Sequence, residues 1–266
     1  MDSFSVAHVL LLFAAAFFAG AINSVAGGGT LLTFPALIWL GLDPKIANAT
    51  STVALWPGLV GGLWGFRREL EKTRSLLLPL GLTSVVGGAI GGLLLIWTPP
   101  ATFARLVPFL ILFATVLFML QEPISRRLKF GEPAATADKN SRRGWWTGAI
   151  LFQFASAVYG GYFGAGNGIL MLAAMGLLGI SDIHSANGLK NFLGLALNIA
   201  AIVAFIISGL VVWPHAALMA VGAIAGGYFG ARTARRLGRT FVRRVVIGVG
   251  FLIFLLMLYR TFLAGR

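Results

Sequence analysis

Long apolar stretches alternate with short polar or glycine-rich breaks along the whole chain of 266 residues. Most of these stretches approach the roughly 20 residues that a helix needs to cross a bilayer. They occupy residues 5–24, 28–41, 46–66, 75–97, 102–121, 145–163, 167–180, 185–208, 214–232 and 240–262. The pattern predicts an all-α fold, a polytopic transmembrane helical bundle.

Two of the apolar stretches are too short to cross the membrane. Residues 28–41 and 167–180 each have about 14 residues, which makes a helix roughly 21 Å long. The hydrocarbon core of a bilayer is about 30 Å thick. Each short stretch also follows a glycine-rich break. The sequence therefore predicts two short, broken helices that enter the membrane only part of the way.

The two halves of the chain resemble each other. Residues 19–51 align without gaps on residues 158–190, at an offset of 139. The identical pairs are Ala26/Ala165, Gly27/Gly166, Gly29/Gly168, Leu31/Leu170, Asp43/Asp182, Ala47/Ala186 and Asn48/Asn187. The short stretches and the breaks before them coincide as well. We therefore divide the chain into a first transmembrane repeat at 1–121, a linker loop at 122–144 and a second repeat at 145–266.

Composition and charge strengthen this interpretation. Hydrophobic residues make up 58% of the chain and charged residues only 11%, against roughly 25% charged residues in a soluble domain. The net charge is +13, and 16 of the 21 basic residues lie within 67–74, 126–143 and 232–244, between apolar stretches. The positive-inside rule places these groups in the cytoplasm. We expect anionic lipid headgroups beside them and no nucleic acid, because the loops are short.

This orientation has a consequence for the two repeats. With the basic groups on the cytoplasmic side, each half contains five membrane segments. Five is odd, so the second half enters the membrane from the opposite side to the first. The sequence thus predicts two inverted-topology repeats, an arrangement found in many secondary transporters. We expect a multi-pass protein of the plasma membrane, in a bacterium the inner membrane.

The two glycine-rich breaks are the first candidate binding groups. They consist of Gly27, Gly28, Gly29, Gly166, Asn167 and Gly168. Glycine lets a ligand approach the main chain, and a helix that starts there offers unpaired N–H donors at its positive end. Two such starts that face each other would form an anion site. The alternative is that the glycines only let helices pack closely.

Polar side chains near the breaks are the second group. The candidates are Asn23, Thr30, Asn48, Ser51, Asn187, Lys190 and Asn191. Amides and hydroxyls donate hydrogen bonds to anionic oxygens, but they also join helices, at about 0.6 kcal/mol per bond. Lys190 is the only charged residue well inside a predicted membrane segment, where a lysine costs about 2.5–3.5 kcal/mol. It pairs with a substrate anion, changes its protonation during transport, or snorkels to the nearby membrane surface.

Several kinds of chemistry have no residues to use. The chain has no cysteine, which excludes disulfides, thiolate metal sites and cysteine nucleophiles. No Asp or Glu lies well inside an apolar stretch, which argues against a carboxylate-lined cation channel. Motifs of metalloproteases, serine hydrolases and ATPases are missing. We therefore expect no enzyme activity, no cofactor and no metal site.

Three motifs resemble a known family. Residues 21–30 read Ala-Ile-Asn-Ser-Val-Ala-Gly-Gly-Gly-Thr, followed by Phe34-Pro35 and by Ala-Asn-Ala-Thr-Ser at 47–51. With the matching motifs at 164–168 and 186–191, they resemble the TauE/SafE family of sulfite/sulfonate exporter-like transporters. Asn167 departs from the pattern by interrupting the second glycine run. The resemblance implies a plasma-membrane permease for sulfite, sulfonates or other small sulfur-containing or organic anions.

The expected function is thus that of a secondary transporter that moves a small anion by alternating access. Two other classes remain open at this point: a passive anion channel, and a membrane subunit that does not transport. The sequence does not determine whether the chain forms a homo-oligomer. It also leaves the substrate, the direction of transport and the coupling ion open.

Overall fold

The computed structural model describes residues 5–25, 27–65, 67–127, 139–180, 182–237 and 239–262. Every regular element in these ranges is helical, and no strand occurs in them. The elements are α1 (Val6–Val25), α2 (Thr30–Trp39), α3 (Pro44–Gly65), α4 (Arg67–Leu70), the 3-10 turn η1 (Glu71–Thr73), α5 (Arg74–Trp97), α6 (Pro100–Arg127), α7 (Lys139–Tyr162), α8 (Asn167–Leu177), α9 (Ile183–Ile207), α10 (Trp213–Leu237) and α11 (Arg239–Phe262). The all-α prediction is confirmed.

Five helices of the described ranges contain segments long and apolar enough to cross a membrane. These segments are Val6–Asn23, Glu71–Trp97, Pro100–Gln121, His184–Ile207 and Arg244–Phe262. The helices α3, α7 and α10 have similar lengths of 22, 24 and 25 residues and pack beside them. The two shorter apolar helices are α2 and α8. These lengths fit a multi-pass membrane protein in which two helices are half-length.

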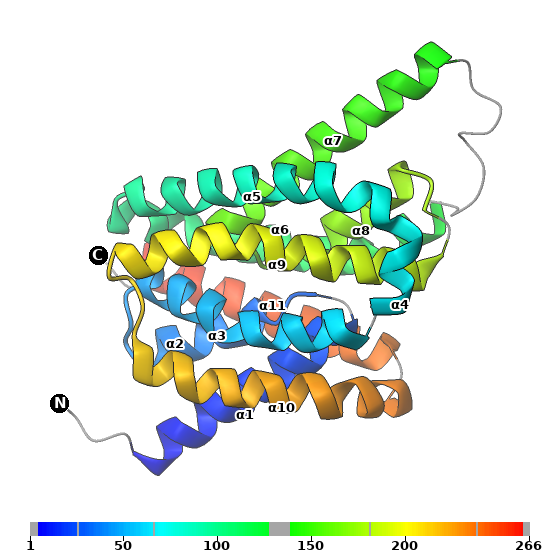
Figure 1. Cartoon of the computed structure of the whole chain (residues 1–266). Coiled ribbons are helices and arrows are strands. Elements are labelled where there is room, and N and C mark those ends of the chain that lie inside the picture. The colour runs from blue at the N-terminus through cyan, green and yellow to red at the C-terminus, as the bar shows by residue number, and fades with distance from the viewer. Residues whose placement is uncertain are drawn as a thin grey trace.

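The long helices lie side by side in one bundle (Figure 1). Helix α1 packs along α10, α5 packs against both α7 and α9, and α6 packs along α11. Helix α3 contacts α10 and α9, so it joins the two sides of the bundle. The short helices α2 and α8 lie toward opposite ends (Figure 1). The bundle therefore has two half-length helices pointing away from a common region.

Hydrogen bonds and an ion pair identify the two ends of the bundle. At one end, which we call the basic end, α4 and η1 contact α9, and Lys72 Nζ lies 3.6 Å from Asp182 Oδ2. At the other end, which we call the far end, Lys45 Nζ donates to the backbone oxygens of Ile96 and Thr98, each at 2.8 Å. The far end thus joins the start of α3 to the end of α5.

Each helix of the second half begins at a nearly constant number of residues after its counterpart in the first half. Helices α5 and α6 begin at residues 74 and 100, and α10 and α11 begin 139 residues later, at 213 and 239. Corresponding helices also make corresponding contacts. Helix α10 packs on α1 and α3, and its counterpart α5 packs on α7 and α9, which are the counterparts of α1 and α3. The repeat thus extends well beyond the aligned 33 residues. The inverted orientation of the halves in a bilayer and the domain limits stay predictions.

Several helices continue past the apolar stretches into the basic segments. Helix α6 reaches Arg127 and α7 begins at Lys139, so much of the predicted linker at 122–144 is helical, and residues 128–138 lie outside the described ranges. Arg, Lys, Gln and Glu are good helix formers, and nothing requires a helix to end at the membrane surface. Hydropathy therefore predicts where a segment leaves the membrane and not where the helix stops.

Glycines let the long helices approach to backbone contact. A Cβ on Gly226 of α10 would overlap the carbonyl oxygen of Phe17 in α1, and one on Gly91 of α5 would overlap that of Val158 in α7. Small residues at helix interfaces give membrane bundles this close packing. The α1–α10 and α5–α7 pairs, each of which joins a helix of the first half to a helix of the second, are thus packed in the same way.

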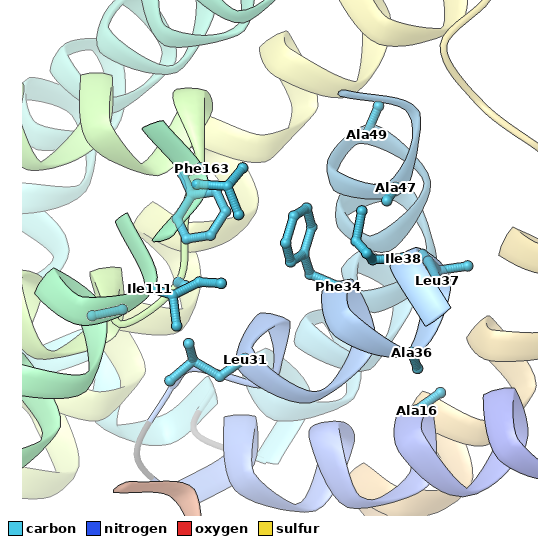
Figure 2. Packing of buried hydrophobic residues seen from close by; sticks show 14 of the residues in the cluster. Ala16, Leu31, Phe34, Ala36, Leu37, Ile38, Ala47, Ala49, Ile111 and Phe163 are labelled. Atoms are coloured by element: carbon cyan, nitrogen blue, oxygen red, sulfur yellow. The ribbon is translucent and has the colours of Figure 1, made fainter. Parts of the chain in front are cut away.

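Buried apolar side chains fix the first short helix in place. Leu31, Phe34 and Leu37 of α2 are almost completely buried. They pack in one cluster with Ile111 of α6 and Phe163 at the end of α7 (Figure 2). This packing sets the position of the break from which α2 starts.

Candidate functional site

The two glycine-rich breaks meet in the structure. A Cβ on Gly27 would lie 3.1 Å from Gly168 Cα, so the two backbones are in contact. Gly27 and Gly28 have φ values of 73° and 134°, and Gly166 has 74°. Residues with side chains rarely adopt such angles, which explains glycine at these positions. The starts of α2 and α8 therefore lie together, as the sequence analysis expects.

A cavity of about 90 Å³ lies beside this contact. Of the thirteen candidate residues, eight line it: Asn23, Gly27, Gly28, Thr30, Asn167, Gly168, Lys190 and Asn191. Both breaks and the helix α9 thus contribute to one site, although they are far apart in the sequence. The arrangement brings amides, a hydroxyl, backbone groups and one ammonium group to a single small space.

The other five candidates do not line the cavity, and four of them contact other parts of the bundle. Asn48 Nδ2 donates to the backbone oxygen of Tyr162 at 3.0 Å, and the hydroxyls of Ser51 and Thr33 lie 2.6 Å apart. These bonds hold helices together, which was the alternative for such side chains.

The remaining three of these five are Gly29, Gly166 and Asn187. A Cβ on Gly29 would meet Ala19, and one on Gly166 would lie 3.5 Å from Ala114. Asn187 is 8% exposed and does not line the cavity. The structure therefore assigns none of the five to the cavity wall, and a binding role for them stays a prediction.

Asn23 occupies the N–H donors of the first break. Its Oδ1 accepts hydrogen bonds from the backbone N–H groups of Gly28 and Gly29, both at 2.7 Å. The sequence predicts that these donors are available to a ligand. In the structure a neutral amide oxygen already stands where an anion would bind.

The second break is arranged differently. Asn167, the counterpart of Gly28, accepts a hydrogen bond from Ser156 Oγ at 2.7 Å. A Cβ on Gly160 would overlap Asn167 Nδ2, so glycine leaves the room that this amide needs. Among the hydrogen bonds of the described residues, none has the Gly168 N–H as its donor. The two half-sites are therefore not equivalent, which fits the interruption of the second glycine run by Asn167.

Lys190 gives the cavity its charge. Its side chain is 4% exposed and its Nζ is fully buried, so in this structure it does not snorkel to the surface of the bundle. No Asp or Glu is among the described residues that line the cavity. A buried positive charge in a small polar space attracts an anion.

Sequence reasoning left further lining residues out of the site. These are Thr52, Leu55, Trp56, Leu59, Gly160, Gly164, Met171, Gly194, Leu197 and Asn198. Positions 52, 55, 56 and 59 follow helical spacing, so they lie on one face of α3. Three of them have counterparts 139 residues later in the lining, at 191, 194 and 198. Combining the helical spacing with the repeat offset would have found this face from the sequence.

Trp56 links the two long helices beside the cavity. Its Nε1 donates to the backbone oxygen of Leu195 at 3.4 Å. Pro57 follows it, yet α3 continues without interruption to Gly65. Packing, and not a helix break, is therefore the role of this Trp-Pro pair.

The identical pair Asp43 and Asp182 caps the helices that carry the site. Asp43 Oδ1 accepts from the Lys45 N–H at 2.8 Å, and Asp182 Oδ1 accepts from the His184 N–H at 3.1 Å. Aspartate at this position satisfies a donor that the first helical turn leaves free. The Ser185 hydroxyl, and then the His184 N–H, hold the pKa of Asp182 below its usual value.

Asp182→Ala is expected to lower the Tm modestly at neutral pH. The ionised carboxylate accepts these bonds, so its contribution is complete above the unfolded pKa of about 3.9. The contribution is lost as the pH falls through the lower folded pKa. Thermal unfolding of both proteins at pH 7 and in steps below pH 4 should show a difference in Tm that narrows with acid. A difference that stays constant in acid would contradict the capping role.

Comparison with known proteins supports the membrane assignment. The model of the family "Sulfite exporter TauE/SafE" matches residues 12–257. A "Probable membrane transporter protein" of Haemophilus influenzae is 30% identical over 251 residues, covering 94% of each chain. The "Probable membrane transporter protein YfcA" of Escherichia coli K12 is 28% identical over 259 residues, covering 96% of this chain and 92% of its own.

A third relative points the same way. The "Probable membrane transporter protein ORF9" of a Sinorhizobium species is 27% identical over 241 residues, covering 90% of this chain and 88% of its own. No solved structure matches the chain significantly. The family match covers nearly the whole bundle, including both breaks and the cavity. The chain therefore belongs to the sulfite exporter TauE/SafE family and is a multi-pass membrane transporter.

Proposed function

We propose that this transporter moves a small anion across the plasma membrane by alternating access, with sulfite, sulfonates or other sulfur-containing or organic anions as substrates. One observation carries the proposal: the buried Lys190 lies in a cavity between two helix starts, with no carboxylate among the described lining residues. The family name adds sulfite as the first substrate to test.

Each group around the cavity has a part in this proposal. Lys190 supplies a full positive charge and Asn191 an amide donor, while Asn198 Nδ2 donates to the Gly194 backbone oxygen at 2.8 Å and has one N–H left. The starts of α2 and α8 add the positive ends of two helix dipoles. One water molecule needs roughly 10–15 Å³ of such space, and the cavity offers about 90 Å³. It therefore has room for a small anion and not for a large metabolite.

The size and polarity of the wall also support a binding step. Leu55, Trp56, Leu59, Met171 and Leu197 form an apolar part of the lining. An anion that leaves water must exchange its hydration for the polar groups on the other part of the wall. A solute held in this way saturates its site, as expected for a transporter.

Flux measurements in proteoliposomes test the proposal. Purified protein is reconstituted, and uptake of radiolabelled sulfite, thiosulfate, sulfate and a small sulfonate is followed with and without a pH gradient. Protein-free liposomes serve as the control. We expect saturable uptake of at least one sulfur anion, with the other substrates competing.

Two outcomes would contradict it in different ways. Flux that grows linearly with concentration and moves no counter-ion would indicate a passive anion channel. No flux of any of the four anions would exclude this substrate class.

A further inference from the structure

Four aromatic side chains pack together in the part of the bundle nearest the far end. We call this cluster the aromatic barrier, and it consists of Phe34 in α2, Phe103 in α6, Tyr162 at the end of α7 and Phe163 beyond it. The three phenylalanines are at most 1% exposed. The ring centroids are 5.5 Å apart for Phe34 and Phe163, 5.6 Å for Phe103 and Tyr162, and 6.5 Å for Phe103 and Phe163. Figure 2 shows Phe34 and Phe163 facing each other.

Hydrogen bonds place the barrier toward the far end. The Tyr162 hydroxyl lies 3.3 Å from Thr98 Oγ1, in the turn between α5 and α6. The backbone oxygen of Tyr162 accepts from Asn48 Nδ2, one turn into α3. Phe103 is the fourth residue of α6, which begins at the far end. The barrier thus lies beneath the turn at 98–99.

The four barrier positions have no aromatic counterparts in the repeat. Residues 139 positions away from Phe34, Phe103, Tyr162 and Phe163 are Ala173, Val242, Asn23 and Ser24. None of these is aromatic. Asn23 lines the cavity, whereas its counterpart Tyr162 does not. The two ends of the site therefore differ in bulk and polarity although the helices around them correspond.

An aromatic layer of this kind blocks an anion. Burying an ion without a polar partner is very costly, and apolar constrictions in membrane proteins close by excluding water. The rings are also attached to the site: Phe34 lies on the helix that starts at the first break, and Phe163 is followed by Gly164, whose φ is 79°. A rearrangement of either break would move a ring of the barrier.

We propose that Phe34, Phe103, Tyr162 and Phe163 form the gate between the cavity and the far end, and that the structure is the state in which this gate is closed. The inference rests on the proposed transport function. Exchange of solute with the far side requires these rings to separate. The repeat positions of these four residues carry no aromatic side chain, so closure at the basic end does not repeat this gate.

The chain has no cysteine, so a single introduced thiol can report access directly. Thr52 lines the cavity, and Thr52→Cys, which replaces the hydroxyl by a thiol and removes one methyl group, is made in the otherwise unchanged chain. Proteoliposomes of defined orientation are treated with a membrane-impermeant thiol reagent from one side or the other. We expect Thr52→Cys to react from the basic end and to be protected from the far end.

The second step removes rings from the barrier. Phe103→Ala and Phe163→Ala, each combined with Thr52→Cys, are expected to raise the labelling rate from the far end about tenfold, equal to about 1.4 kcal/mol in the opening equilibrium. Phe109→Ala is the matched control, because Phe109 lies on the same helix, is 52% exposed and packs on Phe262. It should leave labelling unchanged. If the alanine variants fold poorly, Phe103→Leu and Phe163→Leu replace them. These variants are expected to raise the labelling rate from the far end by a smaller factor.

Labelling needs no transported solute, so its outcome is separate from that of the flux assay. Equal labelling from both sides with the barrier intact would overturn the gate, and so would folded alanine variants with unchanged labelling from the far end. If the labelling pattern holds while no sulfur anion moves, the gate stands and the substrate class falls. If anions move and labelling does not respond to the barrier, the transport function stands and the gate falls.

Discussion

Lys190→Met is expected to abolish saturable anion flux at ordinary substrate concentrations while the protein still folds. Methionine is flexible and apolar and fills a similar space, so the packing of α9 is kept. The variant loses a charged donor, and hydrogen bonds to charged groups contribute about 1.5–3 kcal/mol. This loss corresponds to a rise in KM of about 10- to 100-fold.

A second buried lysine provides the matched control. Lys45 is 7% exposed, but its Nζ donates to two backbone oxygens at the end of α5, and it does not line the cavity. Lys45→Met is therefore expected to lower the Tm while the folded protein keeps its KM. Flux kinetics and thermal unfolding of both variants check the contrast. An unchanged KM in Lys190→Met would remove this lysine from the site, and Lys190→Arg should retain part of the flux.

Gly28→Ala is expected to destabilise the protein strongly and to abolish transport. Gly28 has a φ of 134°, and a Cβ there would overlap the ring of Phe118. A strained backbone angle costs about 1–3 kcal/mol, and overpacking adds about 1–3 kcal/mol. Because the residue also lines the cavity, any shift that relieves the clash moves the first break.

Thermal unfolding and the yield of monodisperse protein measure this effect. Gly61→Ala is the control, because Gly61 lies within α3 and a Cβ there meets nothing within 4 Å. It should leave the Tm unchanged or raise it, since alanine favours helix by about 0.5–1 kcal/mol. Adding Phe118→Ala to Gly28→Ala removes the clash and leaves the backbone strain. A single Gly28→Ala variant with the Tm of the wild type would show that the turn has another geometry.

The helices were predictable because the hydrophobic pattern and the thickness of the bilayer both constrain the length of a membrane-spanning segment. The apolar stretches at 5–24 and 75–97 correspond to α1 at Val6–Val25 and α5 at Arg74–Trp97. The short stretches correspond to α2 and α8 for the same reason. Where α6 and α7 extend into polar sequence, the apolar pattern has already ended, so hydropathy carries no information about the helix end.

The site was only partly predictable. The breaks and Lys190 stand out in the sequence because glycine runs and charges are unusual inside apolar stretches. Ser51 and Thr52 are neighbours on α3 and point about 100° apart, so the sequence alone does not decide which one faces a cavity. Asn48 binds the backbone oxygen of Tyr162, which is 114 residues away. Such a partner is created by the packing of α3 against the end of α7 and has no local signal.

The amide of Asn23 acts on the first break as an internal substitute for a ligand. An anion that binds to the Gly28 and Gly29 N–H groups must displace an oxygen that already accepts from both at 2.7 Å. The number of hydrogen bonds hardly changes in this exchange, so the free energy gained is much smaller than bonds to a bare helix start would give. An anion that binds at this break, as we propose, would therefore be held loosely and released quickly. For a carrier this is an advantage, because a solute held too tightly on one side would never leave on the other.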